Sequence, residues 1–183
     1  MSGSAFYDVG PLEQVAINLF YGWGYNFYRK ENQLRADDLL IRGKVGLLLA
    51  SARKSVETAE RDYRREFLPP PSREKPRPDA TAVAGAQTLE LLSKSIGALI
   101  ALISAQPVPE NDRMTQRYRK EADALKQLIE SDELLIGQAE LLRTMLDQKK
   151  GTWMIENVSD LQEGVHAIQE TLRKRQLLLF SPA

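Results

Sequence analysis

Hydrophobic side chains recur every three or four residues through the first third of the chain. The stripe consists of Ala16, Phe20, Trp23, Phe27, Leu34, Ile41, Val45, Leu48, Ala52, Val56, Ala59 and Tyr63. This spacing places the side chains on one face of a helix. Because an isolated helix is marginally stable, such a face must pack against other helices. The pattern therefore predicts a long amphipathic helix within a helical protein.

Proline and glycine set the predicted limits of this first helix. It begins at Pro11 and stops before the prolines that follow residue 68, because proline cannot continue a helix. About 57 residues would then extend about 85 Å at 1.5 Å per residue. Gly22 and Gly24 mark a weak point. We therefore expect residues 1–33, an aromatic N-terminal extension, to overhang the other helices or to fold back.

Residues 69–78 read Pro-Pro-Pro-Ser-Arg-Glu-Lys-Pro-Arg-Pro, a charged and proline-rich sequence. Proline favours an extended polyproline conformation, which makes a semi-rigid spacer. A ligand for proline-recognising domains is the alternative interpretation. Because the segment lies between two predicted helices, we expect a connector between the first helix and the second.

Helical spacing continues to the end of the chain. It predicts a second helix over residues 79–106, a third over 110–150 that ends at Gly151, and a fourth that follows Trp153. No strand pattern is present. The sequence predicts an all-α fold: a single domain over residues 1–183, folded as an elongated antiparallel four-helix bundle.

The apolar stripes also predict which residues form the core. The second helix has the widest apolar face, because Leu91, Ile100 and Leu102 add to its stripe, and we expect it to be the most buried helix. Five residues at the centres of the stripes are expected to be fully buried: Ile96, Leu128, Leu135, Ile168 and Leu172.

Aromatic residues cluster near the N-terminus. Eight of the 13 lie in the first 28 positions: Phe6, Tyr7, Phe20, Tyr21, Trp23, Tyr25, Phe27 and Tyr28. On a helix, Tyr21, Tyr25 and Tyr28 share a face that is rotated from the main stripe, so a bundle would leave them uncovered. Exposed aromatic patches mark interfaces. We expect Tyr21, Trp23, Tyr25 and Tyr28 to bind a protein partner or a second copy; internal packing and a lipid or small-ligand surface are the alternatives.

Composition narrows the possible chemistry. Lys+Arg and Asp+Glu are both 25, so the net charge is about zero and gives no general attraction to nucleic acid. A one-sided basic face, Arg113, Arg117 and Lys120, is the weak exception. There is no cysteine, which excludes thiol nucleophiles and thiolate metal sites. The N-terminus does not resemble a secretory signal, so we expect a cytoplasmic protein.

Carboxylates interrupt the apolar stripes at Glu31, Asp38 and Asp132. A helical bundle can bind metals through such groups, but those sites also use Glu-x-x-His pairs from two helices. The chain has one histidine, His166, in the single Glu-x-x-His sequence that starts at Glu163. We therefore expect structural carboxylates without metal or cofactor, and a histidine that faces solvent. The candidate ion-pair partners are Arg35, Arg42 and Arg143.

These patterns favour a non-enzymatic interaction or assembly subunit that docks through its aromatic N-terminal region. A cofactor-binding or metal-binding bundle enzyme is the first alternative. The second is a protein that attaches to a membrane surface, because Arg29 and Lys30 directly follow the aromatic cluster.

Overall fold

The computed structural model describes residues 3–22, 34–73, 76–106 and 122–180. Within these ranges the chain is helical and contains no strand. The elements are the 3-10 helix η1 (Gly3–Tyr7) and the α-helices α1 (Val9–Gly22), α2 (Leu34–Phe67), α3 (Ala80–Ala105), α5 (Ala122–Leu146), α6 (Gly151–Glu156) and α7 (Val158–Phe180). The predicted all-α class is confirmed.

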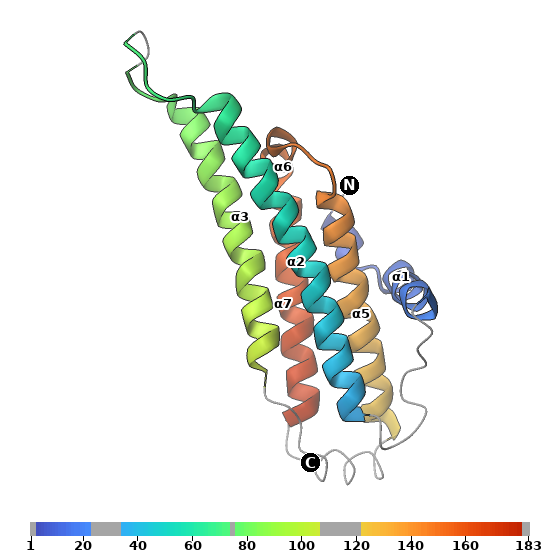
Figure 1. Ribbon diagram of the computed structural model, residues 1–183. Helices are drawn as coiled ribbons and strands as arrows, with labels where there is room; N and C mark the ends of the chain where they lie inside the picture. Colours follow the sequence, from blue (N-terminus) through green and yellow to red (C-terminus); the bar gives the residue numbers. More distant parts are fainter. Residues whose placement is uncertain (1–2, 23–33, 74–75, 107–121, 181–183) are drawn as a thin grey trace.

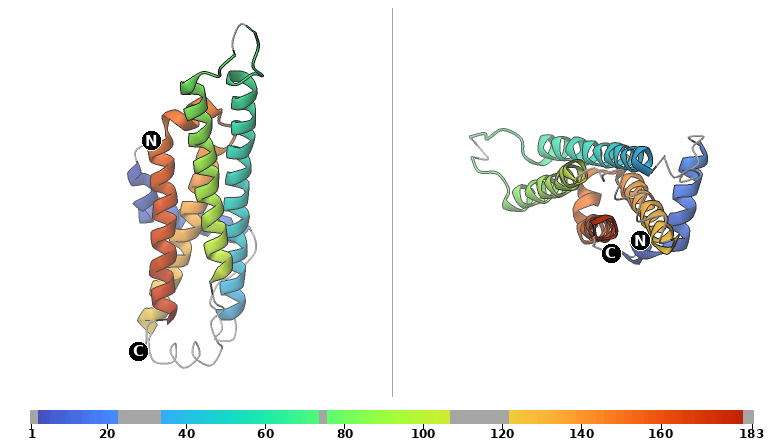
Figure 2. Two further views of the ribbon diagram at one scale, coloured as in Figure 1. Left: turned by 90° about the vertical axis from the view of Figure 1, so that its left-hand side faces the viewer. Right: turned by 90° about the horizontal axis from the view of Figure 1, so that it is seen from below.

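Four helices, α2, α3, α5 and α7, lie side by side along one axis (Figure 1). Helix α2 contacts α3 and α5, and α7 completes the ring by contacting both of these helices. The view along the axis shows the four helices around a common interior (Figure 2). Consecutive helices alternate in direction, but α2 is parallel to its neighbour α5, and α3 is parallel to α7 (Figure 1).

Apolar side chains from all four helices meet in this interior. The five residues predicted to form the core are confirmed: Ile96, Leu128, Leu135, Ile168 and Leu172 are each at most 2% exposed. Helix α2 contributes a row of fully buried side chains, namely Ile41, Val45, Leu49, Ala52 and Val56. The prediction had placed Leu48 in this row, but Leu48 is half-buried. Because three leucines follow one another at 47–49, the pattern alone left the helix rotation ambiguous by one residue.

The predicted continuous first helix differs from the structure. Helices α1 and α2 are separate, and α1 lies across α5 instead of continuing the line of α2 (Figure 1). Leu12 and Ala16 are buried, and α1 contacts α5. The fold-back alternative therefore describes residues 3–22, which we call the N-terminal arm. Residues 23–33 lie outside the described part of the chain.

The second predicted helix corresponds to α3, but its expected burial was wrong. Leu91 is 61% exposed and Leu102 is 39% exposed. The reason is that α3 packs against α2, α6 and α7 with one face and turns the opposite face to solvent. Helix α5 has α1 on its outer side in addition to its contacts with α2 and α7. The start of α3 matches the prediction: Asp79 accepts hydrogen bonds from the backbone N–H groups of Thr81 (2.6 Å) and Ala82 (3.3 Å).

The connection between the third and fourth predicted helices also differs. Helix α5 ends at Leu146, and Gln148 adopts the left-handed backbone conformation with φ 53°. Gly151 is the first residue of α6 and not a C-terminal stop. A side chain at this position would lie 3.1 Å from the backbone carbonyl oxygen of Ala59, so glycine permits a close approach to α2. Asn157 separates α6 from α7 and donates a side-chain hydrogen bond to the carbonyl of Trp153 (2.8 Å).

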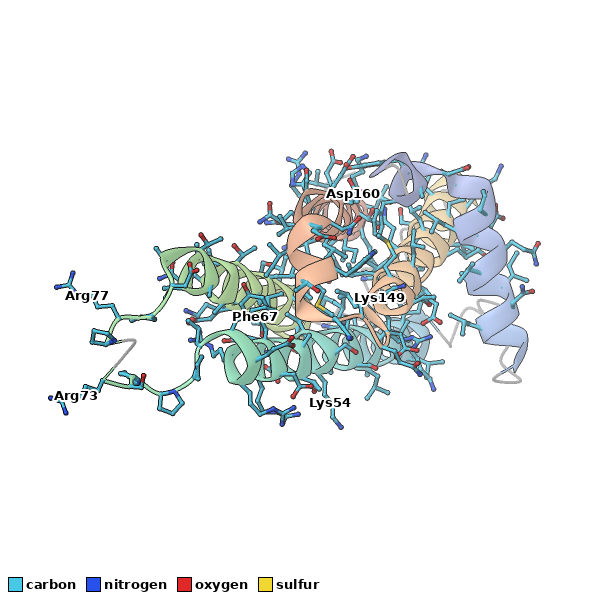
Figure 3. All side chains as sticks on the ribbon, turned by 90° about the horizontal axis from the view of Figure 1, so that it is seen from above. Lys54, Phe67, Arg73, Arg77, Lys149 and Asp160 are labelled. Atoms are coloured by element: carbon cyan, nitrogen blue, oxygen red, sulfur yellow. The ribbon has the colours of Figure 1, made fainter. Side chains whose placement is uncertain are left out.

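The proline-rich segment forms a loop beyond the ends of α2 and α3 (Figure 1). Its described residues have no helical structure and are mainly exposed. Arg73 and Arg77 project away from the helices (Figure 3). The segment thus connects two antiparallel helices from outside their packed region.

Candidate functional site

The side chains predicted to bind a partner lie outside the described part of the structure. Tyr21 belongs to the last turn of α1, but its side chain is outside the described part of the structure. Trp23, Tyr25 and Tyr28 lie in the range 23–33, which the structure does not describe. The expected aromatic face therefore stays a prediction. The basic face of Arg113, Arg117 and Lys120, and also Glu31, likewise lie outside the described residues.

Two aromatic residues of the N-terminal cluster are described, and they have opposite environments. Phe6 is 1% exposed and packs against Gly164 of α7, where a Cβ atom would lie 2.5 Å from the ring. The side-chain amide of Gln138 on α5 donates a hydrogen bond to the Phe6 carbonyl (2.9 Å). Tyr7 is 45% exposed. Phe6 thus anchors the N-terminal arm, while the adjacent tyrosine is available at the surface.

The remainder of the N-terminal arm is held by close contact with α5. A Cβ atom at Gly137 would overlap the backbone of Leu12, so α1 can approach α5 this closely only over glycine. Leu12 is 3% exposed and Ala16 is fully buried. The N-terminal arm therefore packs directly on two glycines, Gly137 of α5 and Gly164 of α7. We call this contact surface the seat of the arm.

Glu133 on α5 lies beside this seat. Partial burial raises the pKa of the Glu133 carboxyl group, and the negative charges of Glu13, Asp132 and Glu130 raise it further. Glu13 belongs to α1, so like charges from both helices face each other across their contact. The ionised form of Glu133 is therefore disfavoured in the folded protein.

Asp132 is buried and paired, and the structure pairs it with an arginine that was not among the candidate partners. Its carboxylate pairs with the guanidinium of Arg175 on α7, and both side chains are at most 3% exposed. Two of the candidate partners make other contacts: Arg42 donates to the carbonyl of Gln106 (2.7 Å), and Arg143 pairs with Glu140 (2.6 Å). The side chain of the third, Arg35, lies outside the described part of the structure. The buried pair joins α5 to α7.

A hollow of about 510 Å³ lies between α5 and α7 beside the N-terminal arm. Its walls are Val9, Gln127, Glu130, Ser131, Leu134, Lys174, Leu177 and Leu178. Leu177 is 54% exposed and Val9 is 50% exposed. This is a surface depression with an apolar floor and a polar rim, a composition typical of interaction sites.

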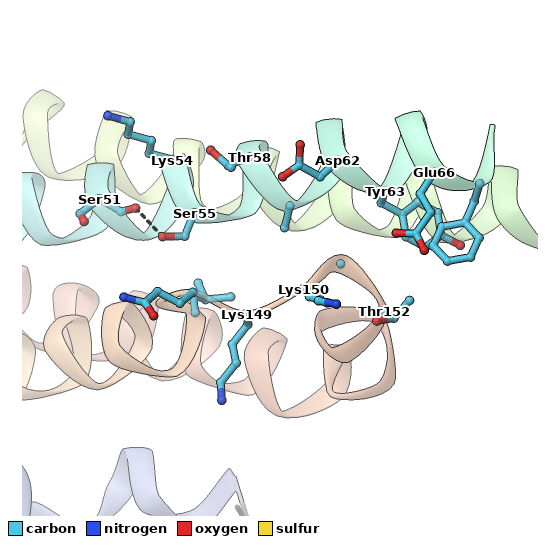
Figure 4. A pocket seen from close by; sticks show the side chains of 15 residues that line it. Ser51, Lys54, Ser55, Thr58, Asp62, Tyr63, Glu66, Lys149, Lys150 and Thr152 are labelled. Carbon is cyan, nitrogen blue, oxygen red and sulfur yellow. Dashed lines mark hydrogen bonds between the residues drawn. The ribbon is translucent and has the colours of Figure 1, made fainter. Parts of the chain in front are cut away.

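A second groove of about 550 Å³ separates α2 from the connection between α5 and α6 (Figure 4). Ser51 and Ser55 line one wall, and Lys150 and Thr152 line the other. Asp62, Glu66 and Lys54 add charges of both signs. Because hydroxyl groups and opposite charges are mixed, the groove has no dominant affinity for anions or cations.

Only some of the residues considered for metal binding are described: Asp132, Glu163 and His166. His166 and Glu163 are both exposed on α7, as expected for a solvent-facing histidine. Among the described residues, no group of three His, Cys, Asp or Glu side chains is arranged to hold a metal ion. Asp38 belongs to α2, but its side chain lies outside the described part.

Helix α3 is the one described helix that is long and apolar enough to cross a membrane by composition. A core helix of a water-soluble protein has the same composition, and 33% of the apolar window is buried against the other helices. This property alone therefore does not assign the chain to a membrane.

Sequence reasoning missed the hollow between α5 and α7. The signal was present: Gln127, Ser131 and Leu134 share a helical face with the spacing i, i+4, i+7, separate from the core stripe. Comparison with known proteins finds no family model, no curated protein and no solved structure that matches this chain. The function must therefore be argued from the site alone.

Proposed function

We propose that this protein is a non-enzymatic interaction subunit built on a four-helix bundle of α2, α3, α5 and α7, and that its aromatic N-terminal region docks on a protein partner. The proposal places Tyr21, Trp23, Tyr25 and Tyr28 at the docking surface, and it expects the protein to act in the cytoplasm.

One observation supports the proposal above others: the N-terminal arm lies outside the four packed helices and crosses α5 (Figure 1). Three of its side chains, Phe6, Leu12 and Ala16, are buried, whereas Tyr7 and Val9 are about half exposed. The chain therefore leaves α1 at the side of the molecule and not within the core. Aromatic residues that follow such an arm are suited to contact another molecule.

The test is a double variant, Trp23→Ser with Tyr25→Ser. The full-length wild type and the variant are immobilised, incubated with extract of the source cells, and their bound proteins are compared by mass spectrometry. We expect the variant to lose partners while its helicity is unchanged, because the core from Ile41 to Tyr63 is untouched. The matched control is Phe67→Ser with Leu91→Ser, which removes two exposed hydrophobic side chains elsewhere and should retain the partners.

The proposal is contradicted if the double variant unfolds the whole protein while the wild type stays monomeric without partners. In that case the aromatic residues belong to the core. Equal loss of partners from the double variant and the control would also contradict it, because binding would then depend on general hydrophobicity.

A further inference from the structure

The N-terminal arm packs on the outside of α5 and α7, where Phe6 lies between Gln138 and Gly164. A hollow beside Val9 is lined farther along the same two helices: Leu134 precedes Gln138 by one helical turn, and Leu178 follows Gly164 by roughly four turns. We call this hollow the lower groove.

The lower groove is lined by two regular helix faces. On α5 the lining residues follow the spacing i, i+3, i+4, i+7, and on α7 they follow i, i+3, i+4. They are Gln127, Glu130, Ser131 and Leu134 on α5, and Lys174, Leu177 and Leu178 on α7. Such spacing is typical of helix faces that pack against another helix. The lower groove therefore has the form of a helix-packing surface.

The same surface carries both a protrusion and a depression. Leu177 is 54% exposed and Val9 is 50% exposed, so both project at the edge of a hollow of about 510 Å³. A surface that has a projecting apolar side chain beside an apolar hollow can match a copy of itself, because each copy inserts its leucine into the hollow of the other.

The rim charges are also self-complementary. Glu130 stands on the α5 side of the lower groove and Lys174 stands on the α7 side. Within the described residues, Glu130 has one ion pair, with Lys126 at 3.8 Å, and both side chains are more than half exposed. Such a pair contributes little. No ion pair to Lys174 is found in the part of the chain that the structure describes. A two-fold axis through the groove would bring each glutamate to the lysine of the other copy.

We propose that the lower groove is a dimer interface that binds the lower groove of a second copy of this chain. The two copies pack α5 and α7 face to face, with Leu177 in the opposite hollow and Glu130 opposite Lys174, each contact occurring twice by symmetry. The interface uses none of the residues from Tyr21 to Tyr28, so it goes beyond the proposed function and does not depend on it.

Sedimentation velocity of the full chain over a range of concentrations tests this interface. The wild type should dimerise reversibly, and Leu177→Glu should raise the dimer dissociation constant by about tenfold or more, because it places a charge in the apolar contact. The matched control is Leu91→Glu on α3, where the leucine is 61% exposed and lies outside the groove. This control should dimerise like the wild type. Thermal unfolding of both variants verifies that the fold is intact.

Charge reversal tests whether Glu130 of one copy pairs with Lys174 of the other. At low salt, Glu130→Lys and Lys174→Glu should each weaken the dimer by about tenfold, because each places like charges together at two symmetric contacts. The double reversal should return the dissociation constant to within about threefold of the wild type. A wild type that stays monomeric up to about millimolar concentration would overturn the proposal. Equal effects of Leu177→Glu and Leu91→Glu, or a double reversal as weak as the single ones, would also overturn it.

Discussion

At the scale of single residues, the buried ion pair between Asp132 and Arg175 is costly to bury but restricts how α5 and α7 can align. Both charges are removed from water, which is unfavourable unless each remains paired. The pair therefore acts less as a source of stability than as a constraint: α5 and α7 can slide or rotate only by separating two buried charges. A polar pair inside an otherwise apolar contact is suited to fixing the alignment of two helices.

This pair gives a prediction about single and double substitution. Asp132→Ala should lower the free energy of unfolding by about 3–5 kcal/mol, because it leaves the Arg175 guanidinium buried without its carboxylate. Asp132→Leu combined with Arg175→Met should recover most of this loss, since apolar side chains of similar volume need no partner. Urea denaturation measures the free energy of unfolding of each variant. A double variant as unstable as Asp132→Ala would show that the site depends on the charges themselves.

At the scale of elements, the N-terminal arm packs closely on α5 and α7 because glycines at the contacts leave room for it. Gly164→Ala should displace Phe6 from α7, because the new methyl group would occupy the position of the ring. We expect faster hydrogen exchange in residues 5–19 and a loss of about 1–3 kcal/mol in the free energy of unfolding. The matched control is Gly43→Ala on α2, where nothing lies within 4 Å. This control should stabilise the helix by up to about 1 kcal/mol.

The contact between α1 and α5 should also respond to pH through Glu133. Its pKa is raised in the folded protein, so the stability that this carboxyl group contributes is present below its ordinary pKa of 4.5 and is lost as the pH rises through the raised value. Glu133→Gln should therefore raise the melting temperature at pH 7 and have little effect at pH 4. The control is Glu156→Gln at an exposed position, which should leave the melting temperature unchanged at both pH values. An equal increase at both pH values would exclude ionisation as the cause.

At the scale of the whole molecule, the spacing of apolar residues predicted more of the structure than the charged and aromatic residues did. The class, the main helices and the five core residues follow from apolar spacing, because burial of one face per helix dominates stability. The path of α1 does not follow from it: Leu12 and Ala16 continue the stripe of α2 equally well, and the preference for α5 depends on Gly137, which lies far away in the sequence. The Arg175 partner of Asp132 and the lower groove are likewise products of tertiary contact.

The seat of the N-terminal arm has a consequence for the order of synthesis. The arm is made before α5 and α7, but the hydrogen bond from Gln138 to Phe6 spans 132 residues, and Gly164 follows later still. At about 5–20 residues per second, the ribosome needs roughly 7–26 s to make this span. A helix of 14 residues is marginal alone, so α1 has neither a partner nor much structure of its own during this time. A segment that is made before the helices it packs on thus waits for α5 and α7 before it can reach its native place, and until then its apolar face is open to any chaperone or neighbouring chain.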